Sequence, residues 1–269
     1  MTRSAADRSR LDRVLVERGL ARSRSHAQSL VREGSVRVDG VVVRRPGEPV
    51  AAEADVVARS DPYVSRAAHK LIGALDDLGL TVAGRALDAG ASTGGFTQVL
   101  LERGCRRVHA VDVGTDQLAP AIRADPRVVV HEQTNLRDLG LAQLDGRPVD
   151  LTVADVSFIS LTLLLAPLAA VTDPAGTMLV MVKPQFEVGR ERLGRGGVVR
   201  SADQHADAVT SVAEAAAAQG WHPAALSRSR LPGPAGNQEF FLLLRGREPD
   251  QPLDVRAAVA AVAAVPTPG

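Results

Sequence analysis

Apolar and polar positions follow two alternating periods over most of this chain, and the order of those periods predicts its architecture. From residue 84 onward, short apolar runs typical of buried strands alternate with segments whose apolar residues recur every three or four positions, as in amphipathic helices. Strands are expected over residues 84–90, 106–114, 126–132, 148–157, 176–185, 221–231 and 238–246. Helices are expected over residues 94–104, 115–125, 161–171 and 203–219. Elements in this order form a mainly parallel sheet with helices on both faces.

The last two predicted strands break the parallel pattern. Only residues 232–237 join them, which is too short for a crossover between parallel strands, so the final strand should run antiparallel to its neighbour. The expected fold is α/β, with a Rossmann-like, mostly parallel seven-stranded sheet. The tail over residues 248–269, rich in Ala, Pro and Val, predicts a weak helix or disorder.

The N-terminal segment predicts a separate, small α+β unit. Apolar residues at helical spacing predict a helix over residues 11–18, which Gly19 ends. Ser23 or Ser25 can cap a second helix that ends before Gly34.

Two alternating runs follow around Asp39-Gly40, and this dipeptide between such runs is a strong signal for a β-hairpin. Pro62 restricts the residue before it to extended backbone, which is typical of a linker. We therefore expect a first domain over residues 1–58, a linker over 59–62 and a second domain over 63–247, followed by the tail.

The composition excludes several classes of protein. The 269 residues include a single cysteine, Cys105, which excludes an internal disulfide and a cysteine-rich metal site, and no metal is expected. The longest apolar stretch, residues 160–171, is shorter than the roughly 20 residues of a membrane-spanning helix. No apolar region follows the basic N-terminus, so no secretory signal is expected. These features predict a cytoplasmic protein that does not enter a membrane, and a monomer is assumed.

Charge is distributed unevenly although the net charge is only +1. Residues 1–60 contain 12 arginines and 8 acidic residues, whereas the rest of the chain has a net charge of −3. A polyanion would therefore meet the N-terminal unit first, although an ordinary solvated surface is the alternative explanation of this excess.

The chain contains two lysines, Lys70 and Lys183, against 30 arginines. Arginine stays charged at every accessible pH, whereas a lysine amine can lose its proton when it is buried or lies near another cation. Lysines that persist against this bias are candidates for chemistry that needs a neutral amine. The alternative is that compositional drift left them behind.

A glycine-rich turn lies between the predicted strand 84–90 and the predicted helix 94–104. Such a turn is where doubly wound folds receive a nucleotide-like ligand. Its spacing, Gly90-x-x-x-Gly94-Gly95, differs from the Gly-x-Gly-x-x-Gly of dinucleotide enzymes.

Polar residues at successive strand ends indicate which ligand this turn serves. Asp88 suits a cationic amino group, Asp112 suits ribose hydroxyls, and Asn135 suits an adenine edge. S-adenosylmethionine combines these groups, and the alternative is a purely structural turn. The candidate cofactor-binding residues are Asp88, Gly90, Ser92, Thr93, Gly94, Gly95, Phe96, Asp112, Asn135, Leu136 and Asp155.

Four further polar residues are expected at the same edge of the sheet, where ligands of open parallel sheets bind. Asp155 and Lys183 close two successive strands, and Glu239 opens the antiparallel strand, whose beginning lies at that edge. Lys70 lies on a helix that starts near Ser65. Each residue alone has an ordinary structural explanation, but their joint placement favours a catalytic site.

The N-terminal unit resembles the S4-like RNA-binding domain over the line RLDRVLVERGLARSRSHAQSLVREGSVRVDGVVV. In that family the second helix and the hairpin present basic side chains to RNA phosphates. The candidate RNA-binding residues of the whole chain are Arg22, Arg24, Arg32, Arg37 and Arg66.

The remainder resembles the FtsJ-like ribose 2′-O-methyltransferases, and in particular the TlyA family, over YVSRAAHKL, LDAGASTGGFT, VDVG, HEQTNLRDL, ADVSFISL, LVMVKPQFEVGRERLGRGGVVR and GNQEFFL. Members of that family fuse an S4-like domain to the methyltransferase, methylate cytidine 2′-hydroxyls of ribosomal RNA, and carry a historical haemolysin label. The resemblance implies S-adenosylmethionine as cofactor and ribosomal RNA within ribosomal subunits as partner. It also implies a catalytic tetrad of Lys70, Asp155, Lys183 and Glu239.

Within this tetrad we expect Lys183 to accept the proton of the ribose hydroxyl as a neutral amine, and Asp155 to orient it. Lys70 would position the hydroxyl or the adjacent phosphate, and Glu239 would hold Lys70. Residues 186–199 predict either a basic flap over RNA or a plain glycine connector. Ser157 to Ser160 could line the substrate slot; Phe158 could stack on a base, although a buried Phe158 is the preferred interpretation.

Three alternatives remain beside this reading. The first is a methyltransferase that acts on a small molecule or a protein, and the second is an RNA-binding assembly factor without activity. The third, a membrane-active haemolysin, is disfavoured because the chain has no basic amphipathic helix with aromatic residues on its apolar face.

Overall fold

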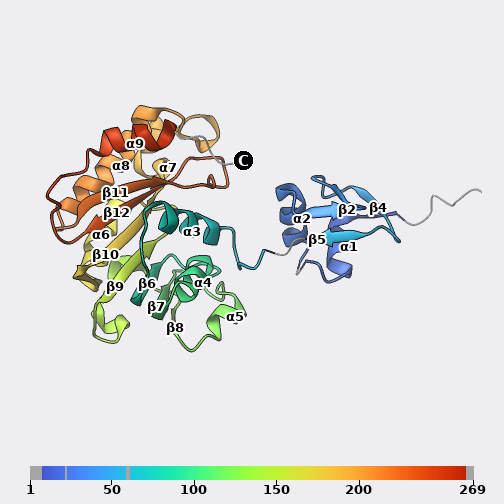
Figure 1. The fold of residues 1–269 in the computed structure, drawn as a ribbon, viewed down its shortest axis with the longest axis horizontal. Helices are drawn as coiled ribbons and strands as arrows, with labels where there is room; N and C mark the ends of the chain where they lie inside the picture. Colours follow the sequence, from blue (N-terminus) through green and yellow to red (C-terminus); the bar gives the residue numbers. More distant parts are fainter. Residues whose placement is uncertain (1–7, 22, 59–60, 265–269) are drawn as a thin grey trace, which may run out of the picture. The chain divides into compact units, whose positions relative to one another are not determined.

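The computed structural model describes residues 8–21, 23–58 and 61–264. These residues belong to two compact units that divide between Pro62 and Tyr63 (Figure 1). Each unit has hydrophobic core clusters of its own.

The described residues of the first unit form two helices and two small sheets around one core. Its helices are α1 (Leu11–Glu17) and α2 (Arg24–Glu33). The strands Val36–Val38 (β2), Val41–Val42 (β3) and Val56–Ala58 (β5) form a sheet in the order β3-β2-β5, and Arg8–Arg10 (β1) pairs with Pro49–Ala51 (β4). The completely buried centre of this unit consists of Leu11, Leu15, Ala27, Val31 and Val36.

The hairpin and both ends of the second helix follow the sequence pattern. Arg37 pairs with Val42 across the predicted Asp39-Gly40 turn. The Ser23 side chain, rather than that of Ser25, caps α2 by accepting a hydrogen bond from the His26 backbone N–H at 3.2 Å. The sequence did not predict β1, β4 and β5, because three residues are too few to show a period.

The second unit is built on one seven-stranded sheet in the order β11-β12-β10-β9-β6-β7-β8. The strands are β6 (Gly84–Ala89), β7 (Cys105–Val111), β8 (Val128–His131), β9 (Val149–Ala154), β10 (Thr172–Val182), β11 (His222–Arg228) and β12 (Phe240–Arg245). Among the described strands of this sheet, β12 alone runs against the others, and it pairs antiparallel with both β10 and β11. The expected α/β fold with an antiparallel final strand is therefore confirmed.

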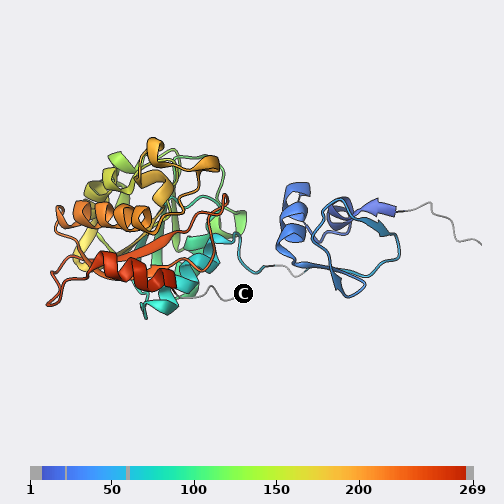
Figure 2. The same cartoon turned by 90° about the horizontal axis from the view of Figure 1, so that it is seen from above.

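Alternate residues of the central strands face two different helical layers (Figures 1 and 2). Leu179 and Met181 of β10 pack with α3 (Ala67–Asp77) and α4 (Gly95–Glu102). Val180 and Val182 face the opposite layer, which contains α6 (Leu165–Val171) and α8 (Ala202–Ala217). The sheet is thus buried on both faces, which explains the continuous apolar runs of its strands.

The remaining helical segments are short, apart from one at the C-terminal end. They are α5 (Pro120–Arg123), α7 (Pro184–Glu187), α9 (Val255–Ala264) and the 3₁₀ turns η1 (Leu136–Asp138), η2 (Leu141–Leu144), η3 (Leu161–Leu163), η4 (Arg190–Arg192) and η5 (Arg195–Gly197). No helix in the described ranges is long and apolar enough to cross a membrane.

Three expected elements differ from the structure. The helix expected over residues 115–125 is reduced to α5, because the chain before Pro120 turns, with Asp116 at a φ of +52°. The helix expected over 161–171 begins as η3 and continues as α6. The tail expected over 248–269 to be a weak helix or disordered contains α9, which packs on α8 and β11; residues 265–269 lie outside the described ones.

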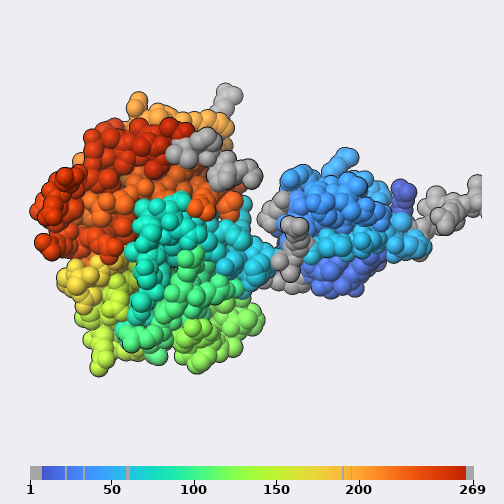
Figure 3. All heavy atoms as spheres, in the orientation of Figure 1, coloured from blue at the N-terminus to red at the C-terminus, as the bar shows by residue number. Residues whose placement is uncertain are grey.

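The order of the strands determines where a ligand can bind. The chain proceeds outward from β6 to β7 and β8 on one side, and then returns to build β9 and β10 on the other side. The crevice at such a reversal, beyond the carboxyl ends of the strands, is the usual ligand site of an open α/β sheet. In the space-filling view the teal segment that carries α3 lies against the orange segment that carries β11 (Figure 3).

Candidate active site

The turn after β6 lets two strand ends approach each other closely. Gly90 has a φ of +88°, and a Cβ atom at this position would lie 2.5 Å from the backbone oxygen of Asp155. A side chain therefore cannot be accommodated without moving the end of β9. The absence of a side chain at Gly90 therefore lets the ends of β6 and β9 lie close together.

Two hollows meet at this point. The first, which we call the lysine cavity, has a volume of about 260 Å³ and is lined by Ser65, Arg66, Ala67, Lys70, Gly90, Ala91, Ser92, Thr93, Gly95, Phe96, Asp155, Ser157, Lys183, Pro234 and Glu239. The second, the Asp112 cavity, has a volume of about 540 Å³ and is lined by Gly90, Ser92, Asp112, Val113, Gln117, Thr134, Asn135, Leu136, Asp155, Val156, Ser157, Phe158, Ile159 and Leu164. Their shared wall consists of Gly90, Ser92, Asp155 and Ser157.

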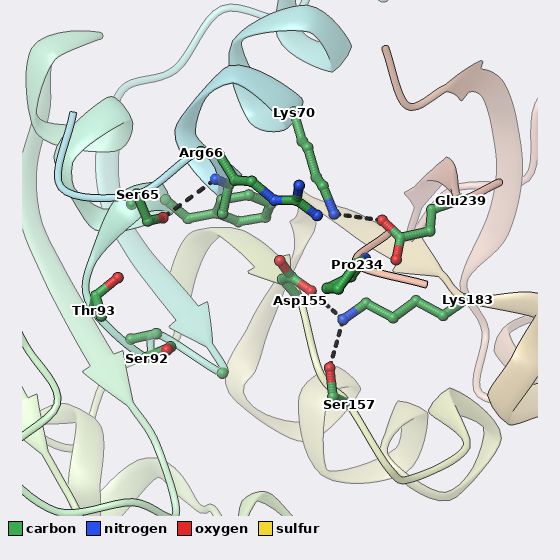
Figure 4. A pocket seen from close by; sticks show the side chains of 15 residues that line it. Ser65, Arg66, Lys70, Ser92, Thr93, Asp155, Ser157, Lys183, Pro234 and Glu239 are labelled. Atoms are coloured by element: carbon green, nitrogen blue, oxygen red, sulfur yellow. Dashed lines mark hydrogen bonds and ion pairs between the residues drawn. The ribbon is translucent and has the colours of Figure 1, made fainter. Parts of the chain in front are cut away.

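The lysine cavity brings together the four polar residues expected there. Lys70 Nζ lies 2.5 Å from Glu239 Oε2, and Lys183 Nζ lies 2.6 Å from Asp155 Oδ1. Both amines point into the same cavity, each beside its carboxylate (Figure 4). The side chains of Lys70, Lys183 and Glu239 are at most 9% exposed, so these charges interact with little screening by water.

The backbone explains why residues so far apart in the sequence meet here. Asp155 directly follows β9, and Lys183 directly follows β10, which is parallel to it. Glu239 directly precedes β12, which runs in the opposite direction and so begins at the same edge. Lys70 comes from α3, which packs against α4 and β11.

Polar groups line one part of the Asp112 cavity and apolar groups line another. Asp112 Oδ2 accepts a hydrogen bond from the Ser92 backbone N–H at 2.8 Å, and its Oδ1 accepts one from the Gly114 N–H at 2.7 Å. Each carboxylate oxygen can accept a second bond, so Asp112 can also receive ligand hydroxyls. Leu136 contributes an apolar wall, and Asn135 caps η1 by accepting from the Arg137 N–H.

Two of the expected cofactor residues do not line either cavity. Gly94 lies beneath the turn as the N-cap of α4. Asp88 is completely buried, and its Oδ2 accepts a hydrogen bond from Thr97 Oγ1 at 2.6 Å. Burial raises the pKa of Asp88 to about 7. The other expected cofactor residues, Gly90, Ser92, Thr93, Gly95, Phe96, Asp112, Asn135, Leu136 and Asp155, all line one or both cavities.

Comparison with known proteins identifies the family to which these two units belong. A family model described as FtsJ-like methyltransferase matches residues 63–246, and one described as S4 domain matches residues 9–57. The 16S/23S rRNA (cytidine-2′-O)-methyltransferase TlyA of Mycobacterium tuberculosis is 50% identical over 244 residues, which cover 89% of this chain and 91% of that protein. The chain belongs to the TlyA family of FtsJ-like methyltransferases.

Two further similar proteins extend this result. A putative rRNA methyltransferase of Bacillus subtilis, YqxC, is 40% identical, covering 87% of this chain and 85% of its own length. The solved structure of a putative hemolysin from Streptococcus thermophilus has a TM-score of 0.75 and 36% identity, and the match covers 96% of this chain and 97% of that one. The predicted family and the predicted fold class, a methyltransferase fold preceded by an S4 domain, are therefore confirmed.

Phe158 corrects one sequence interpretation of this TlyA-family chain. The sequence favours a buried Phe158, but the side chain is 92% exposed and lines the Asp112 cavity. The residue has a φ of +66°, and its ring contacts that of Phe186 with centroids 5.4 Å apart. The preference for burial was wrong because hydrophobicity says nothing about the direction in which a turn points its side chain.

The expected RNA-binding arginines of the S4 unit differ in their surroundings. Arg32 and Arg37 are exposed, and Arg37 Nη1 donates to the Gly40 carbonyl oxygen at 2.8 Å. Arg24 lies 3.2 Å from Oδ2 of the buried Asp12, while its own side chain remains 62% exposed. Arg22 lies outside the described residues.

Arg66 lies in the second unit, at the lysine cavity. It is exposed, and its Nη2 donates a hydrogen bond to the Pro232 carbonyl oxygen at 3.2 Å. Ser65, Gln117 and Pro234 also line the cavities, and the sequence did not predict them because their loops carry no recognisable spacing. In the described part of the chain, no group of His, Cys, Asp and Glu side chains is arranged to hold a metal ion.

Proposed function

We propose that this protein transfers a methyl group from S-adenosylmethionine to the ribose 2′-hydroxyl of a cytidine in ribosomal RNA of one or both subunits. The observation that carries this proposal is the lysine cavity, where two lysine–carboxylate pairs lie beside the Asp112 cavity. The similarity to the 16S/23S rRNA (cytidine-2′-O)-methyltransferase TlyA of Mycobacterium tuberculosis supports this choice of acceptor. The S4 unit supports RNA rather than a small molecule as substrate.

The residues of the Asp112 cavity suit the proposed cofactor. Its volume of about 540 Å³ lies within the range of roughly 300–1,000 Å³ typical of sites for small ligands. Asp112 has acceptor capacity for ribose hydroxyls, Leu136 offers an apolar surface to adenine, and Asn135 adds polar groups. When bound, S-adenosylmethionine supplies an electrophilic methyl group on a sulfonium centre.

The side chains of the lysine cavity then act on the acceptor. Lys183 takes the proton from the 2′-hydroxyl as that oxygen becomes a nucleophile, and Asp155 balances the charge that Lys183 gains. Lys70, held by Glu239, orients the hydroxyl or the adjacent phosphate. Their burial keeps water away from the reacting oxygen, which strengthens each of these interactions.

Exposed groups around the cavities suit a flexible strand of RNA. Phe158 presents its ring to solvent at the edge of the Asp112 cavity, where it can stack on a nucleobase that has left its helix. Arg66 stands at the lysine cavity with donors available for a phosphate. The S4 unit would bind the surrounding ribosomal RNA through Arg32 and Arg37.

The test uses methyl-labelled S-adenosylmethionine and separated ribosomal subunits from a strain whose ribosomal RNA lacks the modification. We expect label in a cytidine ribose, and mapping of the labelled nucleotide gives the target. Label in protein or in small molecules, with none in RNA, would show a different acceptor. Binding of RNA and cofactor with no transfer at all would instead support an assembly factor.

A separate substitution tests whether Lys183 is the base. Lys183→Arg keeps a positive charge but cannot release a proton, so transfer should fall by at least about 1,000-fold while the cofactor Kd changes little. Near-normal turnover of Lys183→Arg would remove Lys183 from the base role without affecting the rest of the proposal.

A further inference from the structure

Lys183 has two close oxygen neighbours, and they contribute differently. Asp155 Oδ1 lies 2.6 Å from Lys183 Nζ, but the contact lacks the alignment of a hydrogen bond. The amine instead donates a hydrogen bond to Ser157 Oγ at 2.7 Å (Figure 4). Asp155 therefore supplies charge, whereas Ser157 determines the direction of an N–H bond.

Direction matters for the chemistry proposed for Lys183. A neutral primary amine has one lone pair and two N–H bonds, and the three staggered rotations about Cε–Nζ point the lone pair in three different directions. An amine that accepts a proton needs its lone pair toward the donor oxygen. A hydrogen bond from one N–H to a fixed acceptor favours some of these rotations over the others.

Ser157 does not hold this position through its own burial, because it is exposed. The loop that carries it is attached at its far end to α7. Glu187, on α7, accepts a hydrogen bond from Ser160 Oγ at 2.5 Å through Oε2, and another from the Leu161 backbone N–H at 2.9 Å through Oε1. The contact between Phe158 and Phe186 is a second link between the same two segments.

The helix α7 is also the element on which Lys183 stands. Lys183 is its N-cap, and its backbone oxygen accepts a hydrogen bond from the Phe186 N–H at 2.9 Å. These contacts form a continuous ring. Lys183 contacts Ser157, the loop leads from Ser157 to Ser160, and Ser160 contacts Glu187, which lies on the same short helix as Lys183.

We propose that Ser157 is a positioning residue that directs the Lys183 amine, and that Glu187 holds Ser157 in place by fixing its loop to α7. This inference rests on the proposed role of Lys183 as proton acceptor. Neither residue belongs to the lysine–carboxylate tetrad expected from the sequence. Ser157 acts by direct contact with Lys183, and Glu187 acts through the loop.

The composition of the chain makes a direct test possible. Because the chain contains only Lys70 and Lys183, protein labelled with ¹³C and ¹⁵N on lysine gives one Cε signal from each, which we follow as the signal of that lysine. In the full-length protein we expect Ser157→Ala and Glu187→Ala to shift the Lys183 signal and leave the Lys70 signal in place. Ser157→Thr, which keeps the hydroxyl, and Glu187→Gln, which keeps an acceptor, should both leave the Lys183 signal near its original position.

Methyl transfer provides the second readout. Ser157→Ala and Glu187→Ala should lower kcat by about 10- to 100-fold, because misplacement of a reacting group by about 1 Å can have that effect. KM for RNA and the cofactor Kd should change less than about threefold. Ser157→Thr and Glu187→Gln should recover most of the loss. Ser211→Ala and Glu214→Ala, at exposed positions of α8, are the matched controls and should behave as the unchanged protein in both readouts.

The results separate this inference from the function on which it rests. A Lys183 signal unmoved in Ser157→Ala, or kcat unchanged, would overturn the role of Ser157. Equal shifts of both lysine signals in Glu187→Ala would show general disruption and overturn the role of Glu187. If the unchanged protein fails to methylate RNA, the proposed function fails, whereas the NMR comparison still decides whether Ser157 and Glu187 fix the amine.

Discussion

At the scale of single residues, the carboxyl group of Asp88 makes the stability of the protein depend on pH. It is completely buried, and its Oδ1 has no hydrogen-bond partner among the described residues. Burial raises its pKa to about 7, so the folded protein binds this proton more tightly than the unfolded chain does. The stability that Asp88 contributes is therefore complete below pH 4 or so and is lost as the pH rises through about 7.

Asp88→Asn should remove this pH dependence. The amide can still accept the bond from Thr97 but does not ionise, so the free energy of unfolding of the variant, relative to the original protein, should rise by roughly 3 kcal/mol between pH 5 and pH 8. Urea denaturation at both pH values measures this difference. Asp116→Asn, at an exposed position, is the control and should show no such trend; a pH-independent effect of Asp88→Asn would refute the argument.

The stability that His109 contributes has the opposite pH dependence, so variant and original protein must be compared at the same pH. Burial lowers the pKa of His109 to about 4, so the stability associated with its neutral form is lost as the pH falls from about 6.5 toward 4. This contribution is common to the variant and the original protein, so it cancels in the Asp88 comparison.

At the scale of elements, the ends of helices and strands decide where the residues of the candidate site lie and where a helix begins. The strand ends place Asp155, Lys183 and Glu239 at one edge, and a helix cap decides where α2 begins. The hydrogen bond from the His26 N–H to Ser23 Oγ satisfies a backbone donor that the helix itself leaves without a partner.

Ser23→Ala should therefore destabilise α2 by about 1 kcal/mol. Amide hydrogen exchange of α2 in the full chain measures this locally, which is useful because the single tryptophan, Trp221, lies in the other unit. Ser25→Ala is the matched control, since Ser25 lies within the helix rather than at its cap, and it should have little effect. Equal losses in the two variants would contradict the assignment of the cap.

At the scale of the whole molecule, two units with separate cores divide the work proposed for the protein. The S4 unit carries the net positive charge, and the methyltransferase unit carries both cavities. Recognition of RNA and chemistry should then respond to different substitutions.

Replacing Arg32 and Arg37 together by alanine should raise KM for ribosomal subunits by about tenfold, with kcat and the cofactor Kd unchanged. The number of counterions released on RNA binding, which the salt dependence measures, should fall by up to about two, because each arginine accounts for at most one phosphate. Binding measured over a range of salt concentrations tests this. Unchanged KM and salt dependence in the double variant would place RNA binding elsewhere.

Arg24→Ala should instead destabilise the S4 unit, because Arg24 pairs with the buried Asp12. The pKa of Asp12 lies well below its usual range, owing first to the hydrogen bonds from Arg10.

The sequence by itself determined the order and type of the long elements, the hairpin at Asp39-Gly40 and the antiparallel last strand. These features follow from hydrophobic period, from turn residues and from the length of connections, all of which act over a few neighbouring positions. Strand ends could be read in the same way, so Asp155, Lys183 and Glu239 could be named before their contacts were known. Lys70 lies on a helix and was singled out because the chain contains only two lysines.

Only the tertiary structure decided which groups touch. Lys70 and Glu239 are separated by 169 positions in the sequence, and their 2.5 Å contact depends on how α3 packs against the sheet. The outward direction of Phe158, the burial of Asp88 away from both cavities and the attachment of the Ser157 loop to Glu187 are likewise results of packing. The physical reason is range: local backbone preferences decide where an element begins and ends, whereas the direction of a side chain within a site is set by neighbours that the chain brings together only when it folds.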